Sequence, residues 1–134
     1  MKNTKKEEIR PWGKYKVLEN FEINSKYDFK DEFEEKEVVI KKITVNPLGV
    51  LSLQSHKQRI EHWVVVQGTG VVDLGAQAFS VQPGYIITIS PNQKHRISNL
   101  DNTNHLVFIE VSRGNFDEED ITRYDDIYDR ADKK

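Results

Sequence analysis

Hydrophobic and polar positions alternate along most of this chain in short runs that end at Gly, Pro or Asn. Side chains on a β-strand point to alternate faces, so runs of this kind are typical of strands that bury one face. The pattern predicts strands at residues 15–18, 38–45, 50–55, 62–66, 71–74, 76–81, 85–89, 95–98 and 104–112. Short strands at regular spacing, separated by turn residues, predict an all-β sandwich or barrel.

Three segments depart from this pattern. Residues 1–9 are polar and highly charged, and we expect a flexible N-terminus there, followed by a single domain over residues 10–134. Residues 21–36 mix aromatic and charged side chains without a clear period, which favours a hairpin or loop excursion. In the acidic tail, Ile121, Tyr124 and Tyr128 recur at helical spacing. We therefore expect a short C-terminal helix or a strap packed on the barrel.

Composition narrows the range of possible functions. The 134 residues suit one domain with its own core. The 20 basic and 22 acidic residues give a net charge of -2, which provides no broad attraction to nucleic acid or to anionic membranes. The first residues lack an apolar signal region, and no apolar run approaches the ~18 residues of a membrane span. We expect a cytoplasmic protein that binds neither nucleic acid nor membranes.

The first candidate site lies around residues 52–63. Gln54 and His56 fall on the same face of a predicted strand, and Glu61 follows after a short turn. The chain has no cysteine, so the site contains no thiolate, and its amide, imidazole and carboxylate groups suit Zn, Mn, Co, Ni or Fe. A single His of this kind is more often a satisfied polar residue than a ligand. The metal hypothesis therefore needs support from elsewhere in the chain.

That support comes from residues 84–99, where a Gly precedes an apolar strand, and a turn, a His and an Asn follow. Asn92 stands in the turn, and Asn tolerates the positive φ that a Gly would adopt there. The two stretches together resemble the two motifs of the cupin superfamily, which implies a small jelly-roll β-barrel. The first motif is matched by Gln54-Ser55-His56, Glu61 and Gly68, and the second by Gly84, His95 and Asn99.

Gln54 stands where many cupins have a His. The Gln-x-His arrangement resembles the mannose-6-phosphate isomerases within the cupins, and the type II group in particular, over nearly the whole chain. The resemblance implies one divalent ion, with Zn as the first choice, held by Gln54, His56, Glu61 and His95. The matching segments are Arg10-Pro11-Trp12-Gly13, Leu51-Ser52-Leu53-Gln54-Ser55-His56, Arg59-x-Glu61-His62-Trp63-Val64-Val65-Val66, Gly68-Thr69 and Glu119-Asp120-Ile121-x-Arg123-x-x-Asp126.

The resemblance implies an aldose–ketose isomerase that interconverts mannose 6-phosphate and fructose 6-phosphate through an enediol. In many type II relatives this region is the C-terminal half of a bifunctional enzyme that also carries a mannose-1-phosphate guanylyltransferase domain. The Gly-rich nucleotide-binding segment of that domain has no counterpart in the sequence. We therefore expect a stand-alone isomerase that binds a hexose 6-phosphate and does not make GDP-mannose by itself.

The same resemblance assigns residues to the substrate. Ser52 and Lys41 are expected to contact its phosphate side, and Arg59 occupies a catalytic basic position. Arg113, near the end of the last predicted strand, is a further candidate for stabilising negative charge. The structural alternatives are solvated rim positions for Lys41 and Arg59, and a core hydroxyl for Ser52. The general base stays unassigned.

Two other functions stay open. One is a non-catalytic sugar- or sugar-phosphate-binding cupin that works beside a separate nucleotidyltransferase. The other is a different cupin enzyme, such as a dioxygenase or a nucleotide-sugar epimerase, which Gln54 disfavours because iron cupins commonly use three His and one Glu. His62 should face away from the ligands as a wall or interface residue. Cupin barrels also pair edge strands into dimers, and the apolar strand at 38–45 fits a homodimer of that kind.

Overall fold

The computed structural model describes residues 7–23, 36–117 and 119–128. Regular structure in this part of the chain is entirely β, and the paired strands are antiparallel. No helix occurs among these residues, and so none that is long and apolar enough to cross a membrane. The strands are β1 Glu7–Arg10, β2 Gly13–Glu22, β3 Glu37–Val45, β4 Leu53–Ser55, β5 Arg59–Gln67, β6 Gly70–Asp73, β7 Ala78–Val81, β8 Ile86–Ile89, β9 Arg96–Ser98, β10 Leu106–Gly114 and β11 Thr122–Asp125.

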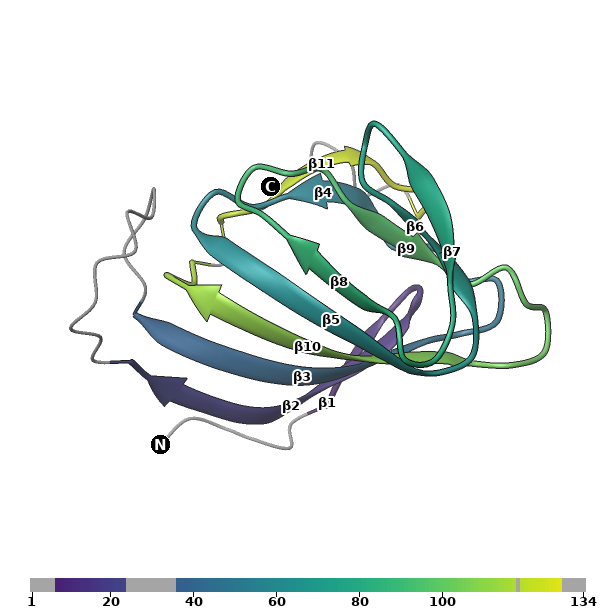
Figure 1. Cartoon of the computed structure of the whole chain (residues 1–134), viewed down its shortest axis with the longest axis horizontal. Coiled ribbons are helices and arrows are strands. Elements are labelled where there is room, and N and C mark those ends of the chain that lie inside the picture. The colour runs from purple at the N-terminus through teal and green to yellow at the C-terminus, as the bar shows by residue number, and fades with distance from the viewer. Residues whose placement is uncertain (1–6, 24–35, 118, 129–134) are drawn as a thin grey trace.

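Six strands form one large curved sheet in the order β1-β2-β3-β10-β5-β8 (Figure 1). Alternate residues of each strand face inward and build the core. Phe108 of β10 lies opposite Ile43 of β3 on one side and Val65 of β5 on the other, and all three are buried. Removing such side chains from water stabilises the fold by about 1.5–3 kcal/mol each. The β-branched character of β3 and β5 thus serves both strand formation and core packing.

Two smaller sheets, β11-β4 and β7-β6-β9, lie over one side of the large sheet (Figure 1). Isolated bridges join them, with Val50 opposite Ser98 and Gln54 opposite His95. The result is a second layer that faces the first across the core. The Gln54–His95 bridge carries two backbone hydrogen bonds, of 3.0 and 2.8 Å. It therefore holds two of the predicted metal ligands side by side at the edge of this layer.

Two turns of the predicted motifs have the expected backbone conformation. Gly68 has a φ of 81°, and a Cβ placed there would lie 2.4 Å from the carbonyl oxygen of His105. Any larger residue would have to displace that backbone. Asn92 has a φ of 68°, which confirms that it takes the place of a turn glycine. Asn99 is buried, and its side-chain amide donates hydrogen bonds to the carbonyl oxygens of Val45, Asn46 and Asn104.

The structure corrects three expectations. The predicted C-terminal helix is wrong for the described residues up to 128, because residues 122–125 form β11 and pair with β4 as a strap. Residues 7–9, assigned to a flexible N-terminus, belong to β1 and pair with β2. The apolar strand at 38–45 is not an edge strand, because β2 and β10 occupy its two sides. Most of the predicted excursion at 21–36 lies outside the described residues.

Candidate metal centre

A cavity of about 410 Å³ opens between the two layers. That volume lies within the range of small-molecule sites, roughly 300–1,000 Å³. Its walls combine core aromatics with polar side chains from eight strands and from the loops beside them. All four predicted ligands line the cavity: Gln54, His56, Glu61 and His95. The predicted substrate contacts Ser52, Lys41 and Arg59 line it as well.

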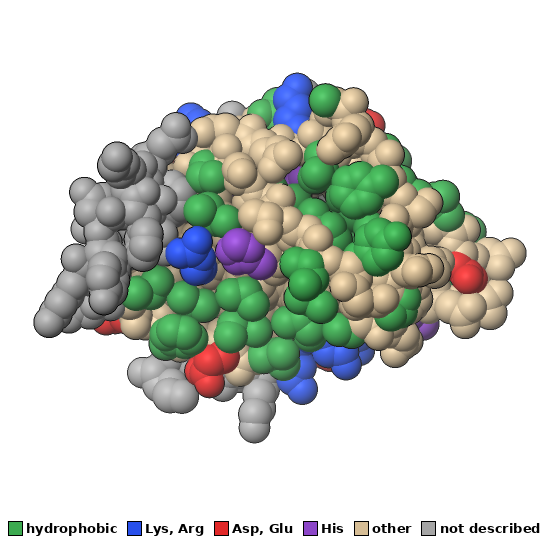
Figure 2. Space-filling view, viewed as in Figure 1, with side chains coloured by type: hydrophobic (Ala, Val, Ile, Leu, Met, Phe, Trp, Pro, Cys, Tyr) green, Lys and Arg blue, Asp and Glu red, His purple; other side chains and the backbone are tan. Residues whose placement is uncertain are grey.

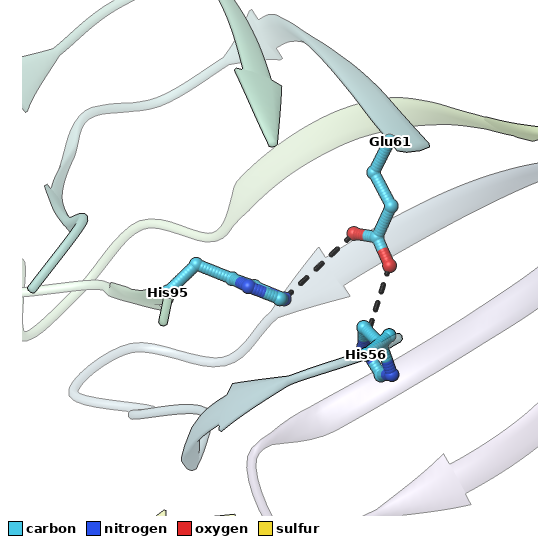
Figure 3. Close-up of side chains that lie close together, drawn as sticks. All are labelled: His56, Glu61 and His95. Carbon is cyan, nitrogen blue, oxygen red and sulfur yellow. Dashed lines mark ion pairs between the residues drawn. The ribbon is translucent and has the colours of Figure 1, made fainter. Parts of the chain in front are cut away.

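Three of the predicted ligands converge inside the cavity (Figure 3). His56 follows β4, Glu61 lies on β5 and His95 precedes β9, and all three side chains are buried. His56 Nε2 lies 3.4 Å from Glu61 Oε2, and His95 Nε2 lies 3.9 Å from Glu61 Oε1. The candidate ligand atoms lie within 4.8 Å of one another. Two ligands about 2.0–2.2 Å from a shared ion lie at most about 4.4 Å apart, so the 3.4 and 3.9 Å pairs fit a shared ion.

The outer nitrogens of both imidazoles are held by backbone carbonyl groups. Nδ1 of His95 lies 2.9 Å from the carbonyl oxygen of Gln93, and Nδ1 of His56 lies 2.8 Å from that of Asp120. A carbonyl oxygen can only accept, so these contacts favour the tautomer with a proton on Nδ1. Nε2 then keeps its lone pair on the side of Glu61. Metal-binding His residues are commonly oriented in this way.

His56 has a second neighbour that favours the opposite tautomer. Arg59 Nη2 also lies 2.8 Å from His56 Nδ1, and it can donate only when that nitrogen carries no proton. The proton would then sit on Nε2 and point toward Glu61. One tautomer thus suits a metal ligand, and the other suits a metal-free hydrogen-bond network. Both groups lie within hydrogen-bond distance of the same nitrogen, so the tautomer decides which of the two contacts is a hydrogen bond.

Burial lowers the pKa of His56 to about 3, and the nearby positive charge of Arg59 adds to the effect. The imidazole is therefore neutral at pH 7. Neutral imidazole is the form that binds metal ions. At neutral pH His56 is therefore not protonated and forms no ion pair with Glu61.

Two hydrogen bonds orient the remaining ligand groups. The indole Nε1–H of Trp63 donates to Glu61 Oε1 at 3.0 Å, and both residues are buried. The side-chain nitrogen of Gln54 donates to Ser52 Oγ at 2.9 Å. This bond engages the amide nitrogen and leaves the amide oxygen, the end that binds metal ions, for the cavity. Two imidazoles, a carboxylate and an amide oxygen fit a borderline divalent ion such as Zn.

The basic residues predicted for the substrate do not all share the cavity. Arg59 reaches the ligands, with Nε 3.8 Å from Glu61 Oε2, and Lys41 extends over the ring of Tyr15. Arg113 was wrongly assigned to the site. It lies opposite Ile60, on the outer face of the large sheet, and does not line the cavity. The alternation of β10 explains this result, because residues 110 and 112 face inward and residue 113 cannot.

His62 also lies on the outer face, as predicted. Its Nδ1 lies 3.2 Å from the hydroxyl of Thr88 on the neighbouring strand. Partial burial lowers its pKa, and the positive charge of Arg113 lowers it further. His62 is therefore a wall residue that faces away from the cavity.

Several cavity residues were not identified from the sequence. Glu110, Trp63, Tyr15, Arg10 and Arg123 all line the same space. Glu110 carries the clearest signal, because it is a charged residue in the middle of an apolar strand. Its face could have been deduced from Phe108, since side chains two apart on a strand point the same way.

Comparisons with known proteins agree with this geometry. The chain matches the family described as Mannose-6-phosphate isomerase C-terminal over residues 1–126. It is 35% identical over 123 residues to the xanthan biosynthesis protein XanB of Xanthomonas campestris pv. campestris, covering 91% of this chain and 23% of XanB. It is 33% identical over 127 residues to the mannose-1-phosphate guanylyltransferase ManC of Salmonella typhimurium, covering 94% of this chain and 23% of ManC. The chain thus spans under a quarter of the length of these relatives.

A solved structure shows the same fold. An uncharacterized conserved protein with a double-stranded beta-helix domain from Klebsiella pneumoniae subsp. pneumoniae has a TM-score of 0.61 and 15% identity, with 83% of each chain covered. The two-layered antiparallel structure is therefore an all-β, cupin-like fold. With the family matched over nearly all of its length, the chain belongs to the Mannose-6-phosphate isomerase C-terminal family.

Proposed function

We propose that this chain is a metal-dependent isomerase that interconverts mannose 6-phosphate and fructose 6-phosphate. The observation that carries the proposal is the buried His56–Glu61–His95 cluster, which lines a cavity large enough for a sugar phosphate in a member of this family. The expected cytoplasmic location and the hexose 6-phosphate partner belong to the same proposal. Gln54 supports it as a fourth ligand that leaves the ion less electron-rich than a third imidazole would.

The bound metal ion, with Zn as the first choice over Mn, Co, Ni or Fe, would supply Lewis-acid polarisation of the substrate oxygens. The side chains of this chain do the remaining work. Arg59 contributes a positive charge beside the ligands, where an enediolate would carry its negative charge. Lys41 and Arg10 approach the ring of Tyr15 from 4.5 and 5.2 Å and supply two cations to another part of the wall. These two cations suit the phosphate group.

The test is turnover by the metal-loaded protein. The chain is loaded with Zn, Mn, Co, Ni or Fe(II) and given mannose 6-phosphate, and fructose 6-phosphate is measured. We expect His56→Ala to lose both metal and turnover. Arg59→Ala should keep the metal and lose turnover, because Arg59 is not a ligand. The matched control is His62→Ala, on the opposite face of β5, which should keep both.

One outcome would contradict the proposed function, and another would contradict only the role given to Arg59. Stoichiometric metal binding without turnover for any of these ions would leave the alternative, a non-catalytic sugar-phosphate-binding domain that acts beside a nucleotidyltransferase. Full activity of Arg59→Ala would remove the role given to Arg59 while leaving the isomerase function intact.

A further inference from the structure

Glu110 is a buried carboxylate in the cavity that does not belong to the metal cluster. Of the residues that line the cavity, two are acidic, Glu61 and Glu110. Glu61 is a candidate ligand, and a carboxylate bound to a metal ion is a poor base. Glu110 is only 6% exposed. It lies on β10 and points into the barrel, so it is not a surface carboxylate. A buried acid costs stability, which makes a functional reason for it worth testing.

The sheet register places Glu110 next to the metal cluster. Ser112 lies directly opposite Glu61 between β10 and β5, and Glu110 is the next inward residue along β10. Glu110 and Glu61 are therefore diagonal neighbours, a relation that separates positions by roughly 7–8 Å. On its other side Glu110 lies opposite Lys41 of β3. The carboxylate thus stands between the metal cluster and the cation expected to bind the phosphate.

One oxygen of Glu110 is oriented, and the other is available. The Ser112 hydroxyl donates to Oε2 at 2.6 Å, a length typical of a strong hydrogen bond to a charged acceptor. Among the described residues Lys41 forms no ion pair with this carboxylate, and its ammonium group lies over the ring of Tyr15, 4.5 Å from the ring centre. Among the described residues no hydrogen bond to Oε1 is formed. Oε1 can therefore accept a proton from a bound substrate.

We propose that Glu110 is the general base that moves the proton between C1 and C2 of the sugar phosphate, an inference that rests on the proposed isomerase function. The carboxylate takes the C2 proton of open-chain mannose 6-phosphate. The C2–H electron pair forms the C1=C2 double bond, and the carbonyl π pair moves to O1, which takes a proton from water.

The second half of the reaction restores the base. The carboxylic acid of Glu110 returns its proton to C1, where the C1=C2 pair forms the new C–H bond. O2 releases its proton to water, and its electron pair forms the C2 carbonyl of fructose 6-phosphate. The proton gained at O1 balances the proton lost at O2, so the step needs no oxidant, reductant or second substrate.

The test is Glu110→Gln in the metal-loaded protein with mannose 6-phosphate. The amide has the same shape and can still accept the Ser112 hydrogen bond through its oxygen. We expect kcat to fall by about 10²- to 10⁴-fold, the usual contribution of a general base, while KM changes only a few-fold. The visible spectrum of the Co(II)-loaded protein should stay unchanged, because Glu110 is not a ligand. Glu19→Gln, at an exposed carboxylate on β2, is the control and should keep full activity.

The outcomes separate this assignment from the proposed function. An active wild type with a Glu110→Gln variant within about threefold of it would overturn the role of Glu110 alone. Loss of the Co(II) spectrum in Glu110→Gln would place Glu110 in the ligand shell and overturn its role as base. An inactive wild type would overturn the isomerase and its base together. If Glu110→Gln does not fold, Glu110→Asp replaces it, and unchanged kcat despite the retracted carboxylate would overturn the assignment.

Discussion

The side chains of the candidate metal centre are held by groups that do not themselves bind the ion. Trp63 fixes Glu61 through its indole N–H, and the carbonyl groups of Gln93 and Asp120 fix the two imidazoles. Such outer contacts keep the ligand atoms pointing at one place before a metal ion arrives. Their removal commonly costs 10- to 100-fold in metal affinity.

Trp63→Phe tests this arrangement at a single hydrogen bond. Phe preserves much of the packing and removes the N–H that orients Glu61. We expect Zn affinity, measured by competition with a chelator, to fall by about 10- to 100-fold. Trp12→Phe is the matched control, because Trp12 is also buried at the cavity wall, and it should change Zn affinity much less. Equal effects of the two substitutions would show that packing, and not the hydrogen bond, sets the affinity.

The lowered pKa of His56 predicts how the stability of the metal-free protein depends on pH. An unfolded His takes up a proton below about pH 6.5, whereas folded His56 takes one up only near pH 3. Between these values the unfolded state binds more protons, so the free energy of unfolding falls as the pH falls. This contribution to stability is fully present above pH 6.5. One proton corresponds to a slope of at most about 1.4 kcal/mol per pH unit.

Urea unfolding of the chelator-treated protein between pH 7 and 5 measures this slope. His56→Gln should make it shallower, and His105→Gln, at an exposed position, should leave it nearly unchanged. A slope that does not differ between wild type and His56→Gln would contradict the account of a buried neutral His56.

At the same scale, spacing in the sequence identified the candidate ligands but not the proposed base. Gln54 and His56 share a strand face, and Glu61 and His95 occur at motif positions, so a local pattern was sufficient. The proposed role of Glu110 depends on its neighbours in the folded sheet: it lies opposite Lys41 and accepts a hydrogen bond from Ser112. The alternation of β10 gives its inward face, but its neighbours on β3 and β5 are known only from the pairing of strands far apart in the sequence. Arg113 was misplaced because the alternation of inward and outward side chains along β10 was not considered at that position.

At the scale of single elements, the strap that carries β11 closes one side of the cavity. The carboxylate of Asp120 accepts hydrogen bonds from the backbone N–H groups of Lys57 and Gln58, at 2.8 and 2.9 Å, and its carbonyl oxygen contacts His56. Tyr124 meets Ser55 through their hydroxyl groups at 2.8 Å. The strap is thereby joined to the loop that presents His56. Strap docking and His56 orientation are therefore coupled.

Asp120→Ala should loosen this connection. We expect faster amide hydrogen exchange at Lys57 and Gln58, because their N–H groups lose a charged acceptor, and a Zn affinity lowered by about tenfold or more. Glu119→Ala, at the exposed neighbouring acid, is the control and should change neither quantity. Unchanged exchange at Lys57 and Gln58 in Asp120→Ala would show that the strap is held by β11 pairing alone.

The strap also shows where the sequence pattern misled. Ile121, Tyr124 and Tyr128 recur at helical spacing, yet Thr122–Asp125 pairs with β4. A free edge on β4 offers backbone hydrogen bonds that a short isolated helix could not match, since helices of this length are marginal in water. The central strands were predicted correctly because β-branched runs favour the extended conformation and the Gly, Pro and Asn residues beside them mark the turns.

At the scale of the whole molecule, the two layers enclose a polar cavity and leave an apolar outer surface on the large sheet. Figure 2 shows hydrophobic side chains gathered over β3, β10, β5 and β8. Outward residues there include Val64, Ile109 and Val111, and Ile86 is 71% exposed. Apolar surface of this kind commonly marks an interaction site.

The homodimer stays a prediction. The strand expected to pair with its copy in the partner, residues 38–45, lies inside the sheet between β2 and β10. Light scattering on the purified chain tests it directly. A dimer would have twice the monomer mass of 15.7 kDa. A mass of one chain at every concentration tested would contradict the predicted dimer and leave the apolar surface unexplained.

We expect the cavity between the layers to convert a sugar phosphate and not merely to hold it. The most direct measurement is an NMR time course of ¹³C-labelled mannose 6-phosphate with the Zn-loaded protein. Fructose 6-phosphate resonances should grow until the two sugars reach equilibrium, and a chelator should stop this growth. Mannose 6-phosphate resonances that broaden on binding, with no fructose 6-phosphate formed while Zn is bound, would contradict this expectation.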